Sequence, residues 1–296
     1  MEIINSRQQI MSTARGLRRE QQRTIGLVPT MGALHEGHLS LVQQARARCD
    51  VVVVSVFVNP TQFGPAEDFK SYPRVLPHDL ELLAPYDVDY VFAPPVEEIY
   101  PEGFSTYIQV EDLTDKLEGA SRPGHFLGVT TVVGILLNIV QPDFAFFGQK
   151  DAQQAIVIKH MVRDLAFPVE ILVVPTVREE TGLAMSSRNE YLTVEERQAA
   201  AVLNRALLQA RSAFEQGERQ AQKLVGIVSE TIEKEASVRI DYVSINDAQS
   251  LEEIVAVDSR PALISLAAFV GKTRLIDNIV LSEKSETSED VAGATA

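Results

Sequence analysis

The chain has 296 residues, more than a single hydrophobic core usually organises, so two domains are expected. Its formal net charge of −14 argues against nucleic acid or an anionic membrane surface as a partner. The single cysteine, Cys49, excludes an internal disulfide framework and predicts a reducing compartment, the cytoplasm, while no apolar run reaches the roughly 18 residues that span a bilayer.

The first 48 residues are locally positive, with seven arginines against three glutamates. A segment of this kind is suited to a small polyanion such as ATP, but it is equally typical of a solvated helix face. The sequence leaves both interpretations open.

Short β-branched runs alternate with helix-period stretches over the first 175 or so residues, a pattern typical of crossover units on a parallel sheet. Val51–Val58 is nearly all apolar, as expected for a central strand covered on both faces. The predicted strands are Thr24–Val28, Val51–Val58, Val88–Phe92, Phe144–Phe147 and Val169–Val174, and the predicted helices are Gly37–Arg48, Pro77–Ala84, Val129–Val140 and Asp151–Leu165. The expected fold class is α/β, with a Rossmann-like parallel sheet and helices on both faces over residues 1–176.

The pattern changes after a predicted boundary near Val177. Two helices are expected at Thr193–Gln216 and Arg219–Ala236, and alternating segments predict strands at Arg239–Ile245, Leu263–Phe269 and Thr273–Leu281. Residues 177–282 should therefore form a smaller α+β C-terminal domain that acts as a lid. Residues 283–296 are rich in Ser, Glu, Ala and Thr, which predicts a disordered tail.

The segment Met31–His38 joins a predicted strand to a predicted helix, so it lies at the carboxyl edge of the sheet, where open α/β sheets bind ligands. Gly32 and Gly37 permit close approach of a phosphate, and the helix that follows offers unpaired N–H groups. His35 and His38 can both donate hydrogen bonds to an α-phosphate, each for a rate factor of about 10²–10³. Helix-borne metal ligands more often stand four residues apart, so no protein metal site is predicted.

A second strand-to-helix turn at Phe147–Asp151 places Lys150 at the same edge, as a point charge for phosphate oxygens. Met185–Arg188 adds two hydroxyl groups and a cation on a loop preceded by Gly182, suited to closing over a triphosphate. Taken alone, Met185–Arg188 would be interpreted as an ordinary solvated loop.

Five sequence blocks resemble the pantothenate synthetase family. His35-Glu36-Gly37-His38 is similar to the HIGH signature of the nucleotidylyl-transferase superfamily, which includes this family. The blocks that carry the resemblance are Val28–His38, Val58–Phe63, Arg122–Phe126, Phe147–Gln154 and Met185–Asn189. They follow the family's order over roughly residues 25 to 192, and five blocks in register do not arise by chance.

The resemblance implies an ATP-dependent ligase that condenses pantoate with β-alanine and releases AMP and pyrophosphate through a pantoyl-adenylate. It implies His38 as the proton donor and a catalytic set of His35, His38, Lys150 and Arg188. The ATP-binding residues that it implies are Met31, Gly32, Ala33, Leu34, His35, Glu36, Gly37, His38, Gly148, Gln149, Lys150, Asp151, Val177, Met185, Ser186, Ser187 and Arg188.

The same resemblance assigns Gln62 and Gln154 to pantoate, and Gln62 also to β-alanine. A neutral amide orients a substrate carboxylate without lowering its nucleophilicity. A bidentate arginine would lower it, because its positive charge would hold the carboxylate charge. Arg122 is a further substrate-binding candidate, whereas His125 is expected to be structural and Tyr72 to be a packing residue. Mg²⁺ should accompany ATP as part of the co-substrate, with no tightly bound prosthetic group.

The family is usually a homodimer, and Val51–Val58 or the segment after it is a candidate for the interface. Two other functions stay open at this point. One is a cofactor adenylyltransferase of the same superfamily, which would keep AMP in its product. The other is a non-catalytic nucleotide-binding protein, which would release no pyrophosphate in response to a substrate.

Overall fold

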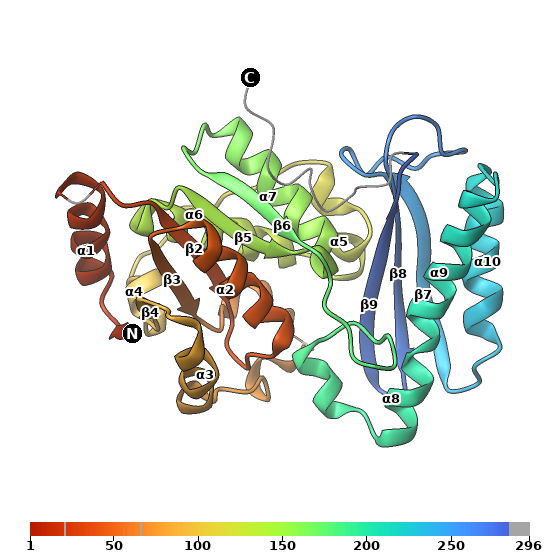
Figure 1. Ribbon diagram of the computed structural model, residues 1–296, viewed down its shortest axis with the longest axis horizontal. Coiled ribbons are helices and arrows are strands. Elements are labelled where there is room, and N and C mark those ends of the chain that lie inside the picture. The colour runs from red at the N-terminus through yellow and green to blue at the C-terminus, as the bar shows by residue number, and fades with distance from the viewer. Residues whose placement is uncertain (21, 66, 284–296) are drawn as a thin grey trace. The chain divides into compact units, whose positions relative to one another are not determined.

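The structure, a computed structural model, describes residues 1–20, 22–65 and 67–283 (Figure 1). The chain forms two compact units. The first consists of Met1–Glu179 and Ala184–Glu190, and the second consists of Glu180–Leu183 and the described residues from Tyr191 onward. The tail predicted at 283–296 lies outside the described residues except for Glu283.

A parallel sheet organises the first unit, and its described strands have the order β1-β4-β3-β2-β5-β6. The strands are β1 (Glu2–Ile4), β2 (Ile25–Thr30), β3 (Val51–Val56), β4 (Tyr90–Phe92), β5 (Phe144–Gly148) and β6 (Glu170–Val174). The chain runs from β2 outward to β3 and β4 and then returns to the other side of β2 as β5. The carboxyl ends of β2 and β5 therefore flank a topological switch point, the usual ligand crevice of such sheets.

Helices cover both faces of this sheet, as predicted. They are α1 (Arg7–Glu20), α2 (Glu36–Arg48), α3 (Leu76–Leu83), α4 (Val96–Ile99), α5 (Glu118–Ser121), α6 (His125–Val140) and α7 (Ala152–Asp164). On one face, Leu39 and Val42 of α2 pack with Val28, Val52 and Phe146 of the strands in one buried cluster. Helix α6 contacts β2 and also packs with α1 and α7 (Figure 1). The predicted α/β fold class with a parallel sheet is confirmed.

Two arginines of the first 48 residues, Arg18 and Arg46, lie at the amino edge of the sheet, away from the switch point. Arg18 pairs with Asp143 (3.2 Å) and Arg46 pairs with Asp89 (2.8 Å). The same two aspartates accept N–H groups near the starts of β2 and β3. These two arginines therefore neutralise carboxylates that cap the strands, and they do not line the cavity described below.

The second unit packs helices on an antiparallel sheet with the described order β7-β8-β9. Its elements are α8 (Val194–Ala200), α9 (Val202–Glu215), α10 (Ala221–Glu233), β7 (Val238–Asp247), β8 (Ala262–Val270) and β9 (Thr273–Leu281). Thr193 caps α8 and forms a capping box with Glu196. The helix predicted over Thr193–Gln216 is divided at Ala201 into α8 and α9.

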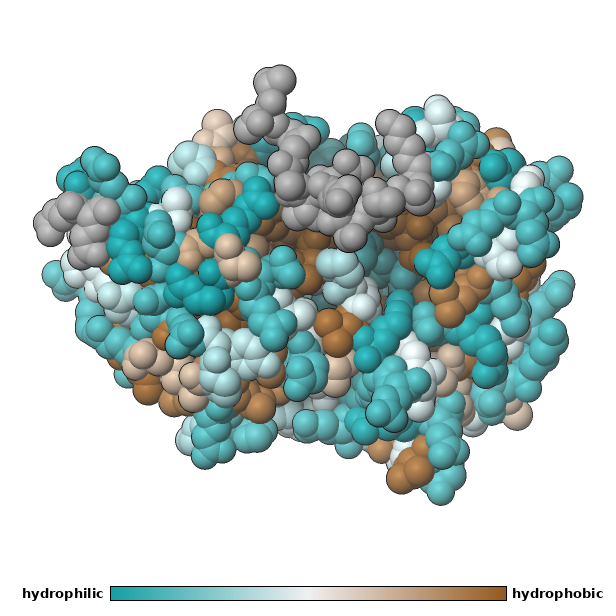
Figure 2. Space-filling model, in the orientation of Figure 1, coloured by the Kyte–Doolittle hydropathy of each residue, from teal (hydrophilic) through white to brown (hydrophobic). Residues whose placement is uncertain are grey.

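Hydrophilic residues cover most of the face shown in Figure 2, in keeping with the high charge of the chain. Within the described ranges, no helix combines the length and the apolar character needed to cross a membrane.

Candidate active site

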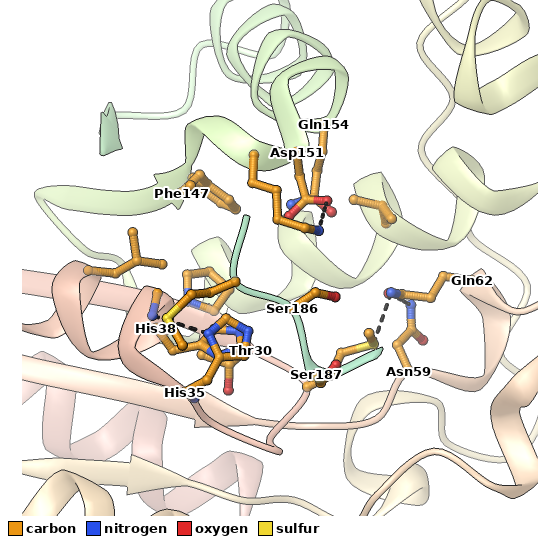
Figure 3. Close-up of a pocket in the computed structure, with 18 of the residues that line it drawn as sticks. Thr30, His35, His38, Asn59, Gln62, Phe147, Asp151, Gln154, Ser186 and Ser187 are labelled. Atoms are coloured by element: carbon orange, nitrogen blue, oxygen red, sulfur yellow. Dashed lines mark hydrogen bonds and ion pairs between the residues drawn. The ribbon is translucent and has the colours of Figure 1, made fainter. Parts of the chain in front are cut away.

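One cavity at the switch point gathers most of the predicted site residues, and all of its lining belongs to the first unit. The carboxyl ends of β2 and β5, helix α6 and the segment 185–188 each contribute to its wall (Figure 3). The predicted residues that line it are Met31, His35, Gly37, His38, Gln62, Arg122, Gly148, Lys150, Asp151, Gln154, Val177, Met185, Ser186, Ser187 and Arg188.

Five residues predicted to bind ATP are not part of this wall: Gly32, Ala33, Leu34, Glu36 and Gln149. Leu34 is 7% exposed and belongs to the core beneath α2, because its apolar side chain is turned into the protein. The N–H groups of Ala33 and Leu34 donate to the Asp79 carboxylate, at 3.2 and 2.8 Å. Glu36 is exposed, at the first residue of α2.

His35 and His38 are held by backbone N–H groups at the start of α2. His35 is the N-cap residue, and its Nδ1 accepts from the N–H of Gly37 at 3.1 Å. Nδ1 of His38 accepts from the N–H of His35 at 3.4 Å. Because Nδ1 is an acceptor in both rings, a neutral imidazole must carry its proton on Nε2. Both histidines therefore keep one N–H donor for a ligand.

Burial keeps both histidines uncharged at neutral pH. The pKa of His35 is lowered to about 4, mainly by burial and then by the charge of Lys150. The pKa of His38 is lowered to about 3, mainly by burial and then by His35. The nearby carboxylate of Asp151 opposes both shifts. A neutral imidazole donates a hydrogen bond well but is a poor acid, which favours hydrogen-bond donation over proton transfer for His38.

The second turn brings an ion pair to the opposite side of the cavity. Lys150 Nζ lies 3.3 Å from Asp151 Oδ1, just before α7 begins at Ala152. The pKa of Asp151 is lowered, because the charge of Lys150 and its hydrogen bond together outweigh the burial that would raise it. Figure 3 places Asp151, just before α7, together with Gln154 of α7, across the cavity from His35 and His38. Asp151 partly balances the cation that would otherwise oppose the helix dipole.

The Gln62 amide has a fixed orientation. Its Oε1 accepts from Asn59 Nδ2 at 3.0 Å, and its Nε2 donates to the Met31 sulfur at 3.0 Å (Figure 3). Asn59 is 1% exposed, and it donates in turn to the carbonyl of Gly128 at 3.1 Å. A thioether is a weak acceptor, so a substrate carboxylate can replace it at Gln62 Nε2 at little cost.

Two adjacent carboxylates hold the two cavity arginines. Arg188 Nε and Nη2 donate to Asp68 at 3.2 and 3.1 Å. Arg122 Nε and Nη2 donate to Glu67 at 2.7 and 2.8 Å. An anionic ligand must therefore compete with Asp68 or Glu67 for these guanidinium groups.

His125 links Arg122 to Gln62. Its Nδ1 lies 2.8 Å from the Gln62 carbonyl oxygen, which can only accept, so Nδ1 carries the proton. Nε2 is then the acceptor for Arg122 Nη1 at 3.1 Å. The pKa of His125 is lowered to about 4 by burial and by Arg122, which keeps the ring neutral. This geometry supports the structural role expected for His125, although the ring also lines the cavity.

Sequence reasoning missed several lining residues. Asn59 stands three residues before Gln62, and its amide fits the same chemistry, which is the signal that could have found it. Tyr72 is 5% exposed, lines the cavity and places its hydroxyl 3.4 Å from Ser187 Oγ, so it does more than pack. An apolar wall comes from Leu41, Phe57, Val129, Val132, Val133, Leu136 and Phe147. Helix α6 is apolar nearly all round, and that pattern predicts a helix with two buried faces.

Comparisons with known proteins agree with this geometry. The chain matches the family model described as pantoate-beta-alanine ligase over residues 2–280. It is 55% identical over 275 residues to the pantothenate synthetase of Herpetosiphon aurantiacus, covering 92% of this chain and 100% of the relative. It is 59% identical over 267 residues to that of Moorella thermoacetica, covering 89% of this chain and 93% of the relative.

Solved structures give the same result. The crystal structure of pantothenate synthetase from Thermus thermophilus has a TM-score of 0.88 and 47% identity, covering 94% of this chain and 99% of that one. Pantoate-beta-alanine ligase from Francisella tularensis, complexed with beta-gamma ATP and beta-alanine, has a TM-score of 0.78 and 37% identity. That likeness covers 95% of this chain and 97% of the other.

Proposed function

The chain belongs to the pantoate–β-alanine ligase family, and from this membership we propose how its own residues carry the reaction. Its activity is the ATP-dependent joining of pantoate to β-alanine, which forms pantothenate. We base the assignment of roles on one observation: residues of the turns after β2 and β5 line the same cavity at the switch point.

The reaction proceeds in two steps in this proposal. A pantoate carboxylate oxygen bonds to the α-phosphorus of ATP, the bond to the bridging oxygen breaks, and pyrophosphate leaves. The amine of β-alanine then attacks the carbonyl carbon of the pantoyl-adenylate, loses a proton, and AMP leaves. In both steps negative charge grows on phosphate oxygens, so fixed donors and cations around the phosphates accelerate them.

We assign the nucleotide side of the cavity to the two turns and the segment 185–188. The Nε2–H groups of His35 and His38 donate to phosphate oxygens, and the N-terminus of α2 adds its dipole. Lys150 supplies the positive charge. Arg188 joins when phosphate displaces Asp68 from its guanidinium group.

We assign the pantoate side to Gln62, Gln154 and the apolar wall. Gln62 Nε2 donates only weakly, to the Met31 sulfur, so it suits a substrate carboxylate, and the orientation of the amide is set by Asn59. Pantoate carries two methyl groups on one carbon, which suit the valine side chains of α6 in the wall. Arg122 is the remaining substrate candidate, and it must share or release the Glu67 carboxylate before it binds another.

Mg²⁺ enters with ATP in this proposal, held by phosphate oxygens and water as is common for this ion. Among the residues that the structure describes, no group of three or more His, Cys, Asp or Glu side chains is arranged to hold a metal ion. Asp151, beside Lys150, is the nearest carboxylate to this role.

We also propose a homodimer and a cytoplasmic location, the latter from the single buried cysteine. Both edges of β3 are paired within the chain, with β2 and β4, so the segment after this strand is the part of that candidate interface that we propose. Segment 104–110 is a further candidate, since in the described structure it joins neither sheet and its Tyr107 is 52% exposed. The lid role of the second unit stays a prediction.

The chemistry is tested by leaving out one substrate at a time. Protein mixed with MgATP and pantoate should release one pyrophosphate per site, and β-alanine should then release AMP and pantothenate in equal amounts. Oxygen-18 placed in the pantoate carboxylate should appear in AMP. A label absent from AMP would exclude the acyl-adenylate, a product that retains AMP would indicate an adenylyltransferase, and absence of pantoate-dependent pyrophosphate would indicate a non-catalytic protein.

A further inference from the structure

A buried carboxylate outside the cavity holds the first turn. Asp79 on α3 is 0% exposed, and it does not line the cavity. Its Oδ2 accepts the N–H of Ala33 at 3.2 Å, and its Oδ1 accepts the N–H of Leu34 at 2.8 Å. These bonds join segments 45 and 46 residues apart in the sequence. Asp79 therefore fixes the backbone that leads into His35.

The turn needs such a partner because its backbone is strained. Gly32 has φ +77° and Ala33 has φ +50°, so two consecutive residues adopt the left-handed conformation. Glycine accepts this conformation freely, but alanine is disfavoured there by its Cβ. Successive N–H groups in a turn form a concavity that attracts an anion. In this chain the anion is a side chain of the protein.

Close packing supports the same arrangement. A Cβ placed on Gly32 would lie 2.9 Å from Asp79 Oδ2, so this glycine leaves the space that the carboxylate occupies. Burial raises the pKa of Asp79, and the N–H groups of Leu34 and Ala33 oppose that shift. Gly32 thus leaves the space for the Asp79 carboxylate, and the N–H groups of Ala33 and Leu34 bind it there.

The turn passes its geometry on to the histidines. The N–H of His35, directly after Leu34, donates to Nδ1 of His38, and the His35 side chain caps α2. A shift of the Ala33–Leu34 backbone would move the N–H that fixes the His38 tautomer. We propose that Asp79 is a positioning residue, which sets the orientation of His35 and His38 for the phosphates by holding the Ala33–Leu34 backbone. This proposal rests on the assignment of both histidines to ATP.

The second unit offers a matched control. Asp247 is 8% exposed, and its Oδ1 accepts the N–H groups of Gln249 and Ser250, each at 2.9 Å. It is a buried carboxylate that holds a loop through two backbone bonds, as Asp79 does, but this loop belongs to the second unit and contributes no residue to the cavity. Asp247→Asn therefore reports the cost of losing such a cap without a change at the histidines.

The test is Asp79→Asn, whose amide keeps one acceptor but sets N–H against N–H at the other bond. Pantoate-dependent exchange of pyrophosphate into ATP should fall about 10- to 100-fold in kcat, with the KM for pantoate unchanged within about twofold, because small misplacements cost up to about 10². Asp247→Asn should leave exchange within about twofold of wild type. Nitrogen-15 NMR should show that His38 loses its single Nε2-protonated form in Asp79→Asn only.

A second variant guards against misfolding. Asp79→Asn combined with Ala33→Gly relieves the strain at position 33, and it should fold where the single variant does not while exchange stays below that of wild type. Wild-type exchange in a folded Asp79 variant, an unchanged His38 spectrum, or an equal loss in Asp247→Asn would each overturn the inference. A wild-type protein without pantoate-dependent exchange would instead overturn the proposed function.

Discussion

The turns after β2 and β5 lie side by side at one edge of the sheet, but they are built in opposite ways. The two histidines of the β2 turn are neutral at pH 7, and backbone N–H groups hold both rings at Nδ1. The β5 turn carries a charge on the flexible side chain of Lys150, which is paired with Asp151. The first turn supplies oriented donors, and the second supplies charge.

This difference teaches that the two requirements of phosphate chemistry are met by separate segments. Fixed neutral donors cost little to bury and need no reorganisation during the reaction. A buried cation is expensive unless it is paired, and Lys150 is paired until a phosphate arrives. A change in either turn should therefore have its own kinetic signature.

The largest effect is expected for Lys150→Ala, which removes the charge of the β5 turn. Because the cation acts on both bound ATP and the transition state, kcat/KM for ATP should fall by about 10³-fold, with a higher KM. Steady-state kinetics with ATP varied measures this. Lys159→Ala, an exposed lysine on the same helix α7, is the control and should behave as wild type. A decrease in kcat/KM for ATP of less than about tenfold would show that Lys150 has no catalytic role.

His38→Ala breaks the neutral turn instead and should cost about 10²-fold in kcat, since one oriented donor is lost from the transition state. The KM for ATP should change little, which separates this variant from Lys150→Ala. His160→Ala on α7 is the control, because this histidine contacts Arg163 outside the cavity. If Lys150→Ala and His38→Ala changed kcat and the KM for ATP in the same way, the proposed difference between the two turns would be wrong.

Gln62→Glu removes the bond to the Met31 sulfur but none of the phosphate donors of either turn, so it should have a smaller effect. The carboxylate still accepts from Asn59, but the donor to pantoate is lost and a repelling charge replaces it. The KM for pantoate should rise by about tenfold while the KM for ATP stays constant, as expected for one hydrogen bond to a charged group. A rise in the KM for ATP would show that the two sides of the cavity are not independent.

Local chemistry made much of the fold and part of the site predictable. The apolar run at Val51–Val56 predicts a buried strand, and the glycines around His35 predict a ligand-binding turn. Strand β1 went unnoticed because its three residues, Glu2–Ile4, are too few for a period and depend on pairing with β4. Short local elements that rely on distant partners leave little trace in the sequence.

Asp79 and the lining residues of α6 were missed because they act through contacts distant in sequence. Asp79 holds a backbone 45 residues away, and α6 supplies the apolar wall only after it packs beside β2. Conversely, Leu34 belongs to the recognised block, yet it serves the core. A motif identifies a segment as functional, but the packing of each side chain decides which of its residues face the ligand.

The most direct test of this account is a pH titration of His35 and His38 by nitrogen-15 NMR on histidine-labelled protein, with signals assigned from single substitutions. Both rings should keep one proton, on Nε2, and remain uncharged from pH 8 down to about pH 5, because their pKa values are about 4 and 3. Double protonation near the ordinary value of 6.5, or a proton on Nδ1, would contradict the claim that the β2 turn is a neutral, pre-oriented donor pair.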